Sequence, residues 1–238
     1  MNSIRHPSIS FLRALFLLVL AFSIVACVDL SGTIRTIKKK NAQSQTAKPQ
    51  KAVAKTVKRD GEVHTMLGGL GVFSTGMYQL HDSVDERFGV VVTSGMWYNA
   101  GLVVRDIKKY YYAHNPHRPI ILVGHSLGAN EQIKVARTLN KAGIPVALLV
   151  TIDAVSQTIV PPNVKEALNM YKPGYVPMFS GLKLRAVDPK TTRIDNVNVA
   201  ELKNVTVNHF TIDKHDAVQE IILARIDKVL RNAETLRS

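Results

Sequence analysis

The feature of this sequence that most constrains its fold is the pentapeptide Gly-His-Ser-Leu-Gly at residues 124–128. It follows the apolar, β-branched run Ile120 to Val123, and it precedes Ala129 to Asn140, where apolar residues recur at helical spacing. A G-x-S-x-G motif between a strand and a helix is typical of a serine nucleophile held on a sharp turn. Small residues are needed beside that serine because strand and helix pass close together there. The sequence therefore predicts that Ser126 is a nucleophile.

Short apolar runs alternate with helical stretches from Glu62 to the end of the chain. This alternation predicts one α/β domain over residues 61–238, with a mostly parallel sheet covered by helices on both faces. The expected strands are 63–67, 89–93, 120–123 and 146–152, with weaker ones at 182–187 and 205–207, and the expected helices are 75–87, 99–114, 129–140 and 213–231.

The first 26 residues have the pattern of a secretory signal peptide. Arg5 and Arg13 precede an apolar stretch, 14–26, that contains no charged residue. The stretch ends in Ile-Val-Ala-Cys, which resembles the lipobox of bacterial lipoproteins, and Cys27 is the single cysteine of the chain. We therefore expect cleavage before Cys27, lipidation of its thiol, and an exported, membrane-anchored protein that faces the periplasm, with Val28 favouring the outer membrane. An uncleaved membrane anchor is the alternative.

The excess of positive charge belongs to the segment that follows. The whole chain has a formal net charge of +13. Residues 31–60 carry nine Lys or Arg and one Asp, whereas residues 61–238 carry 20 basic and 16 acidic residues, interspersed. Residues 27–60 are therefore expected to be a flexible basic tether, either lying along anionic lipid or simply solvated. The folded domain lacks the clustered charge of a nucleic-acid-binding face, so no nucleic-acid partner is expected.

A serine nucleophile needs a histidine to accept its proton and a carboxylate to orient that histidine. Asp153 is the favoured acid because it directly follows the expected strand 146–152, at the end of a parallel sheet where catalytic groups gather. Asp188 and Asp195 remain as alternatives. His209 is the favoured base because it comes two residues after the expected strand 205–207, whereas the rival His215 starts a helix.

The oxyanion of such a reaction needs two preorganised N–H donors. One is expected to be the backbone N–H of Leu127, at the positive end of the helix after the serine. The second is expected from the glycine-rich loop after strand 63–67, at Gly69 or Leu70. A phosphate-binding loop is disfavoured because no Gly-Lys-Ser/Thr follows. The histidines lack metal-ligand spacing, so neither a metal nor another cofactor is expected.

These motifs resemble the α/β-hydrolase superfamily over residues 61–238, and more narrowly a group of small bacterial exported hydrolases of the lipase-like or thioesterase-like kind. The resemblance rests on the serine elbow and on the segments 69–77, 150–153, 162–171 and 208–214. It implies Ser126 as nucleophile, Asp153 as acid and His209 as base. The acid then falls one strand earlier than is usual in the superfamily, and the front of the fold is trimmed.

The expected activity is hydrolysis of carboxylic esters, with a lipid-like or acyl substrate, through a Ser-His-Asp triad and an acyl-enzyme. Residues 154–180, together with Trp97 and Tyr98, are expected to line the substrate pocket at the active-site end of the sheet. Two alternatives stay open: a non-catalytic lipoprotein that only binds a ligand on the same scaffold, and a thioesterase. The expected partners are thus a small ester or lipid substrate and a membrane.

Overall fold

The computed structural model describes residues 59–69, 71–176 and 179–236. They form a sheet that is parallel throughout, with the strand order β2-β1-β3-β4-β6-β8. Because β1 and β3 are neighbours while β2 lies on the far side of β1, the order reverses between β1 and β3, and ligands bind at such a switch point in open α/β sheets. The strands are β1 (Glu62–Leu67), β2 (Val91–Met96), β3 (Ile120–His125), β4 (Val146–Ile152), β6 (Val164–Tyr171) and β8 (Arg193–Asn198).

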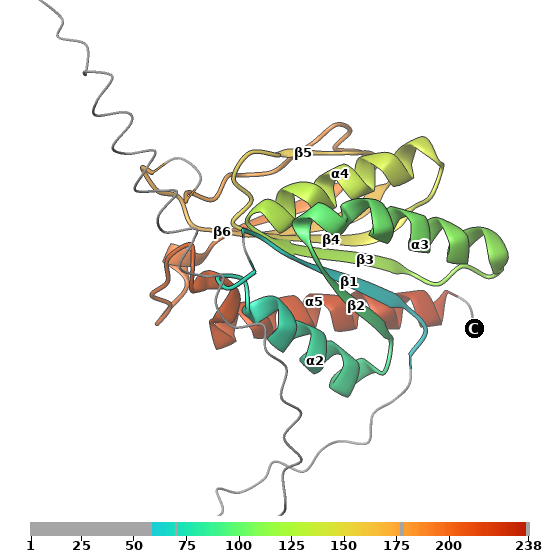
Figure 1. Cartoon of the computed structure of the whole chain (residues 1–238), viewed down its shortest axis with the longest axis horizontal. Coiled ribbons are helices and arrows are strands. Elements are labelled where there is room, and N and C mark those ends of the chain that lie inside the picture. The colour runs from blue at the N-terminus through green and yellow to red at the C-terminus, as the bar shows by residue number, and fades with distance from the viewer. Residues whose placement is uncertain (1–58, 70, 177–178, 237–238) are drawn as a thin grey trace, which may run out of the picture. The chain divides into compact units, whose positions relative to one another are not determined.

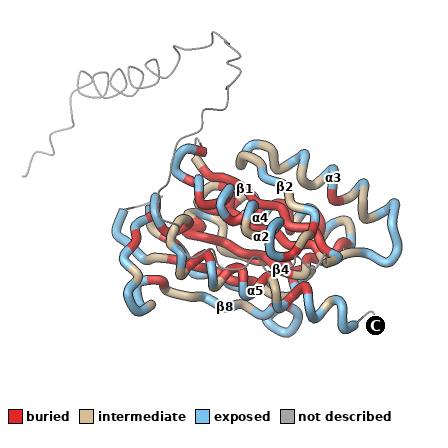
Figure 2. The backbone as a smooth tube through the Cα atoms, turned by 90° about the horizontal axis from the view of Figure 1, so that it is seen from below, coloured by how far each residue is buried: buried red, intermediate tan, exposed pale blue. Residues whose placement is uncertain are grey.

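Helices cover both faces of this sheet (Figure 1). Helices α2 (Gly76–Phe88) and α5 (Asp216–Thr235) pack on one face, and α3 (Ala100–Ala113) and α4 (Leu127–Lys141) pack on the other. Each face has its own apolar core, and the central strands β1, β3 and β4 are almost entirely buried (Figure 2). The predicted fold class, a mostly parallel sheet with helices on both faces, is therefore confirmed.

Several expected elements differ from the structure near the C-terminal half of the sheet. The weak strand at 182–187 shrinks to β7 (Arg185–Ala186), which pairs with β5 (Ile159–Val160) in a small separate sheet. The expected strand at 205–207 is not a strand, because its backbone hydrogen bonds close turns instead. Two strands of the main sheet, β6 and β8, were not expected. β8 is an edge strand with half its residues exposed, so its sequence, RIDNVN, lacks an apolar pattern.

Residues 1–58 are outside the described part of the chain, so the expected signal peptide, the lipidation of Cys27 and nearly all of the tether stay predictions. Within the described ranges, no helix is long and apolar enough to cross a membrane.

Candidate active site

Ser126 lies on a sharp turn between β3 and α4. Its backbone has φ 58° and ψ −121°, a conformation that residues other than glycine rarely adopt. The turn is tight because strand and helix nearly touch: a Cβ on Gly124 would lie 2.5 Å from the carbonyl oxygen of Gly128, and one on Gly128 would lie 2.2 Å from that of Met66. The two glycines of the pentapeptide are therefore required by close backbone approach.

His209 connects the serine to Asp153. The Nε2 atom of His209 lies 2.9 Å from the Ser126 hydroxyl oxygen, and its Nδ1 atom lies 3.1 Å from Oδ2 of Asp153. Asp153 follows β4 and is fully buried, and its second oxygen, Oδ1, accepts the backbone N–H of Lys172 at 2.7 Å. The structure thus brings together the three residues that the sequence predicts as nucleophile, acid and base.

The partners of His209 fix its tautomer. A carboxylate can only accept hydrogen bonds, so Nδ1 of His209 carries the proton that Asp153 accepts. Nε2 is then left with its lone pair toward Ser126, and the serine hydroxyl donates to it. This is the protonation state in which a histidine can remove a proton from the serine as the hydroxyl attacks a substrate.

The rival residues have other roles. Asp188 opens a turn and accepts the backbone N–H of Lys190, and Asp195 lies on the exposed part of β8, where it pairs with Arg225. His215 caps α5 by accepting the backbone N–H of Ala217. None of the three contacts the serine or the base, so the geometry favours Asp153 and His209.

Backbone donors for an oxyanion surround the serine. Leu127 is the first residue of α4, so its N–H has no carbonyl partner within that helix. The loop after β1 lies directly against this turn, because a Cβ on Gly68 would be 2.8 Å from Cβ of Ser126 and 2.9 Å from the Leu127 nitrogen. Gly69, at φ 52°, is in the same loop, and the indole N–H of Trp97 donates to its carbonyl at 2.8 Å. The other expected donor, Leu70, lies outside the described residues.

A pocket of about 230 Å³ opens over the serine and is mostly apolar. Phe73, Phe179 and Phe210 line it, with ring centroids 5.0 Å apart for Phe73 and Phe210 and 5.3 Å apart for Phe179 and Phe210. Of the expected lining segment, residues 154–180, Val155 and Phe179 contribute. Its middle instead forms β6, because that stretch is the buried neighbour of β4, so the expectation was wrong there.

Trp97 and Tyr98, which were also expected in the pocket, are not among its lining residues. A larger hollow, of about 360 Å³, lies at the opposite ends of the strands, near Ile120, Pro145 and Lys165. It is remote from the serine, so we place the site at the smaller pocket. No cluster of His, Cys, Asp or Glu suited to a metal ion occurs in the described residues.

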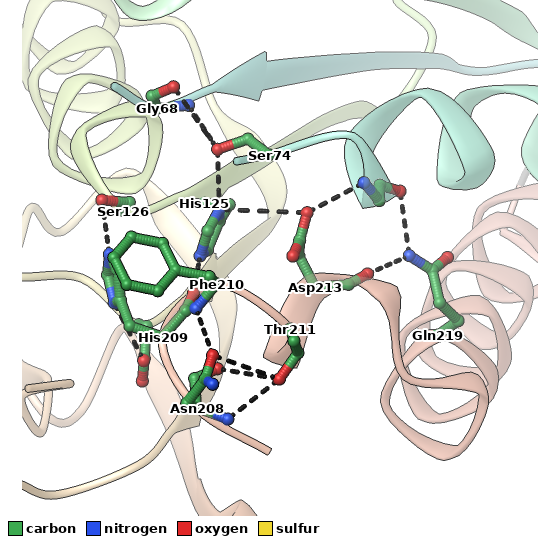
Figure 3. Close-up of polar contacts among 12 residues, drawn as sticks. Gly68, Ser74, His125, Ser126, Asn208, His209, Phe210, Thr211, Asp213 and Gln219 are labelled. Atoms are coloured by element: carbon green, nitrogen blue, oxygen red, sulfur yellow. Dashed lines mark hydrogen bonds and ion pairs between the residues drawn. The ribbon is translucent and has the colours of Figure 1, made fainter. Parts of the chain in front are cut away.

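Behind the serine lies a buried polar network that the sequence did not predict (Figure 3). His125 contacts the Ser74 hydroxyl through Nδ1 at 2.8 Å and the carbonyl oxygen of His209 through Nε2 at 2.9 Å. Asp213 accepts the backbone N–H of Gly76 at 2.9 Å. The position of His125 directly before Ser126 was the one sequence feature that could have pointed to this network, but its hydrogen-bond partners cannot be inferred from the sequence alone.

Burial governs the charge states in this network. Burial, and next the nearby His209, lowers the pKa of His125 to about 3. Burial also raises the pKa of Asp213 to about 6, against the opposing effects of Lys214 and the Gly76 N–H. His125 is therefore neutral across the physiological range, and Asp213 changes its charge near pH 6.

No known family model matches this chain, and no curated protein matches it. Several solved structures are similar at low identity. A thioesterase of the prodiginine pathway of Streptomyces coelicolor, RedJ, has 11% identity and a TM-score of 0.45, covering 76% of this chain and 97% of its own. Human thioesterase 2 has 11% identity and a TM-score of 0.43, covering 71% and 96%. A cutinase-like protein from Cryptococcus sp. has 14% identity and a TM-score of 0.40, covering 71% and 94%.

The architecture of the site follows from the chain's own geometry. The nucleophile lies on a turn between a parallel strand and a helix, and the acid and the base come after it in chain order. Both lie beyond the carboxyl ends of strands of a parallel sheet with helices on both faces. These features together give this protein the α/β-hydrolase fold.

Proposed function

We propose that this protein is a serine hydrolase that cleaves carboxylic esters. The observation that carries the proposal is the continuous hydrogen-bonded series from Ser126 through His209 to the buried carboxylate of Asp153. A serine hydroxyl alone is a weak nucleophile, and this arrangement activates it. The strained backbone at Ser126, maintained by close packing on both sides, is also what a nucleophile on a turn requires.

The proposed reaction has two halves. The Ser126 oxygen attacks the ester carbonyl while Nε2 of His209 takes the serine proton, and the negative charge on the carbonyl oxygen is held by backbone N–H groups near Leu127 and Gly69. The intermediate collapses, the imidazolium gives its proton to the departing alcohol, and an acyl-serine remains. Water then attacks this ester with His209 again as the base, which releases the acid and restores the serine.

The pocket supports an apolar acyl group as the part of the substrate next to the ester. Phenylalanine rings form much of its wall, and its volume of about 230 Å³ suits a short or medium acyl chain better than a bulky one. The same groups would attack a thioester, whose carbonyl is equally exposed to the serine. Paired p-nitrophenyl esters and acyl thioesters of two to eight carbons would therefore separate the esterase from the thioesterase alternative.

Labelling with a fluorophosphonate tests the mechanism without assuming a substrate. We expect the reagent to modify Ser126 of the purified protein, as located by peptide mass mapping, and we expect His209→Ala to abolish the labelling. A Thr65→Val variant is the control because it removes a buried hydroxyl on β1, away from the site. If the folded protein is not labelled, the ligand-binding alternative gains weight. If ester hydrolysis survives Ser126→Ala, the assigned nucleophile is wrong.

We further propose, from the sequence, that the enzyme is exported and anchored through lipid on Cys27. The support is the signal-like segment that ends in Ile-Val-Ala-Cys. Metabolic labelling with a radioactive fatty acid should mark the wild-type protein and not Cys27→Ser. Recovery of both proteins in the soluble fraction, unlabelled, would contradict lipidation.

A further inference from the structure

We infer that Ser74 and His125 are positioning residues, which hold the glycine-rich loop after β1 and the catalytic His209 in fixed register through one buried series of hydrogen bonds. The inference rests on the proposed hydrolase function and assigns parts of its machinery beyond the triad. The series runs from the Gly68 N–H to the Ser74 oxygen at 3.0 Å, from Ser74 to His125 at 2.8 Å, and from His125 to the His209 carbonyl at 2.9 Å.

The donors in this series all point the same way. A backbone carbonyl can only accept, so Nε2 of His125 carries the proton that the His209 carbonyl accepts. Nδ1 of His125 is then an acceptor, and the Ser74 hydroxyl donates its one proton to it, leaving the Ser74 oxygen to accept from Gly68. Hydrogen bonds aligned in this manner strengthen one another in a low-dielectric interior. The series thus has one arrangement of protons.

Burial makes this arrangement rigid. Ser74 and His125 are each 1% exposed, so water does not replace a lost partner easily. An unpaired polar group at this depth is costly, and His125 stays neutral because burial lowers its pKa to about 3. His125 itself therefore does not take up a proton near neutral pH, although the neighbouring Asp213, whose Oδ2 lies 3.9 Å from its Nδ1, changes charge near pH 6.

Both ends of the series lie on parts of the active site. Gly68 is packed against the Ser126 turn so closely that even a Cβ would collide with it, and it begins the loop that contains Gly69. At the other end is the backbone of His209 itself, between the coil after β8 and the start of α5. Figure 3 shows Ser74 and His125 between these two segments, which are far apart in sequence.

A second connection ties the same two segments together. The Asp213 carboxylate accepts the N–H of Gly76, the first residue of α2, and the Gln219 amide donates to the Gly76 carbonyl at 2.9 Å. Asp213, from the segment that carries His209, thus contacts the chain two residues after Ser74. The contacts of Asp213 and Gln219 with Gly76 hold the start of α2 against the segment that carries His209. Deleting only the Ser74 hydroxyl should therefore shift the loop and His209 slightly without unfolding them.

The function of the series is geometric. A tetrahedral intermediate is stabilised only when the backbone donors and the base keep their positions to within a fraction of an ångström. In this site the donors and the base come from different segments, and His125 is the side chain that spans the gap between them. The expected loss is therefore in the rate of the chemical step, with substrate binding nearly unchanged.

The test compares Ser74→Ala and His125→Asn with controls matched in burial. The second variant can keep an acceptor near Ser74 and removes the donor to His209. We expect each to lower kcat for p-nitrophenyl butyrate about 10- to 100-fold, with KM within about 3-fold of wild type, and to slow fluorophosphonate labelling by a similar factor. Thr65→Val removes a hydroxyl and His64→Asn replaces an imidazole at buried positions of β1, so they should lower Tm similarly but leave kcat unchanged.

The outcomes separate this inference from the proposed function. If wild type is labelled and hydrolyses the ester, but both folded variants keep kcat within 2-fold of wild type, the positioning role is refuted and the triad stands. If the controls lose as much kcat as the variants, the effect is merely one of stability and the inference also fails. If wild type is neither labelled nor active, the proposed function itself fails, and the inference fails with it. Should Ser74→Ala not fold, His125→Asn decides by the same criteria.

Discussion

Replacing Asp153 by Asn removes one acceptor from a side chain that serves two donors. In the structure, one carboxylate oxygen accepts the N–H of Lys172 and the other accepts Nδ1–H of His209. An amide has only one oxygen, so its NH₂ group must face one of these donors. The Lys172 N–H belongs to the backbone and always donates, whereas an imidazole can move its proton. We therefore expect the amide oxygen to face Lys172 and the NH₂ group to face His209.

The Asp153→Asn change should therefore alter the tautomer of His209. To accept from the new amide, His209 must carry its proton on Nε2, and that atom can then no longer accept the proton of Ser126. The same Asp-to-Asn change in a comparable triad, which also leaves the histidine in the wrong tautomer, lowers kcat by about 10⁴-fold. That corresponds to roughly 5 kcal/mol of transition-state stabilisation. KM should change little, because Asp153 is fully buried and does not line the pocket.

Steady-state hydrolysis of p-nitrophenyl butyrate measures this effect, with thermal unfolding to confirm that Asp153→Asn is folded. Asp188→Asn is the matched control, because it makes the same change in an aspartate that only closes an exposed turn, and it should retain wild-type kcat. A folded Asp153→Asn protein with more than a tenth of the wild-type kcat would refute the tautomer argument. Equal losses in both variants would show that the assay reports something other than the triad.

Three further changes test the packing, the pocket and the charge of this site. Gly128→Ala puts a methyl group 2.2 Å from the Met66 carbonyl oxygen and should lower the unfolding free energy by ~3 kcal/mol in urea titration, while Gly101→Ala, in open space, should not lower it. Phe179→Ala should lower kcat/KM for a butyrate ester relative to an acetate ester roughly 5-fold, through lost contact with the acyl chain; an unchanged ratio would place the chain elsewhere. The raised pKa of Asp213, about 6, means that its stabilising contribution is present below its ordinary pKa and lost as pH rises through 6. Asp213→Asn should remove that loss, up to ~3 kcal/mol, in unfolding curves from pH 4 to 8; parallel curves would refute it.

The sequence predicted the parts of the fold that have a strong local pattern. Strands β3 and β4 are buried on both faces and are largely apolar runs, whereas β1 is equally buried but has Glu62, His64 and Thr65 among its apolar residues. The glycines of the serine turn have a steric requirement that no other residue meets. β6 has a charged pair, Lys165 and Glu166, directly after its first residue, and β8 is a polar edge strand. β6 pairs with β4, and β8 pairs with β6. Their local sequences alone do not indicate these pairings.

The candidate site shows the same division. Asp153 could be predicted because it directly follows a recognisable strand. His209 was favoured because of an expected strand, 205–207, that the structure lacks, yet its side chain lies within hydrogen-bond distance of Ser126 and Asp153. The partners of His125 could not be predicted, since they are a hydroxyl 51 residues before it and a carbonyl 84 residues after it. Contacts of this range depend on the packing of whole elements.

The wide spacing of the site residues also makes the order of events in folding matter. The serine and its base are 83 residues apart, and β4, β6 and β8 all lie between them in the chain. The ribosome adds Ser126 long before His209, so under the proposed mechanism a growing or truncated chain that ends before His209 has the serine without the histidine that would activate it. In refolding of the full chain, fluorophosphonate reactivity should likewise return only after the strands between the two residues have formed and have brought His209 to Ser126.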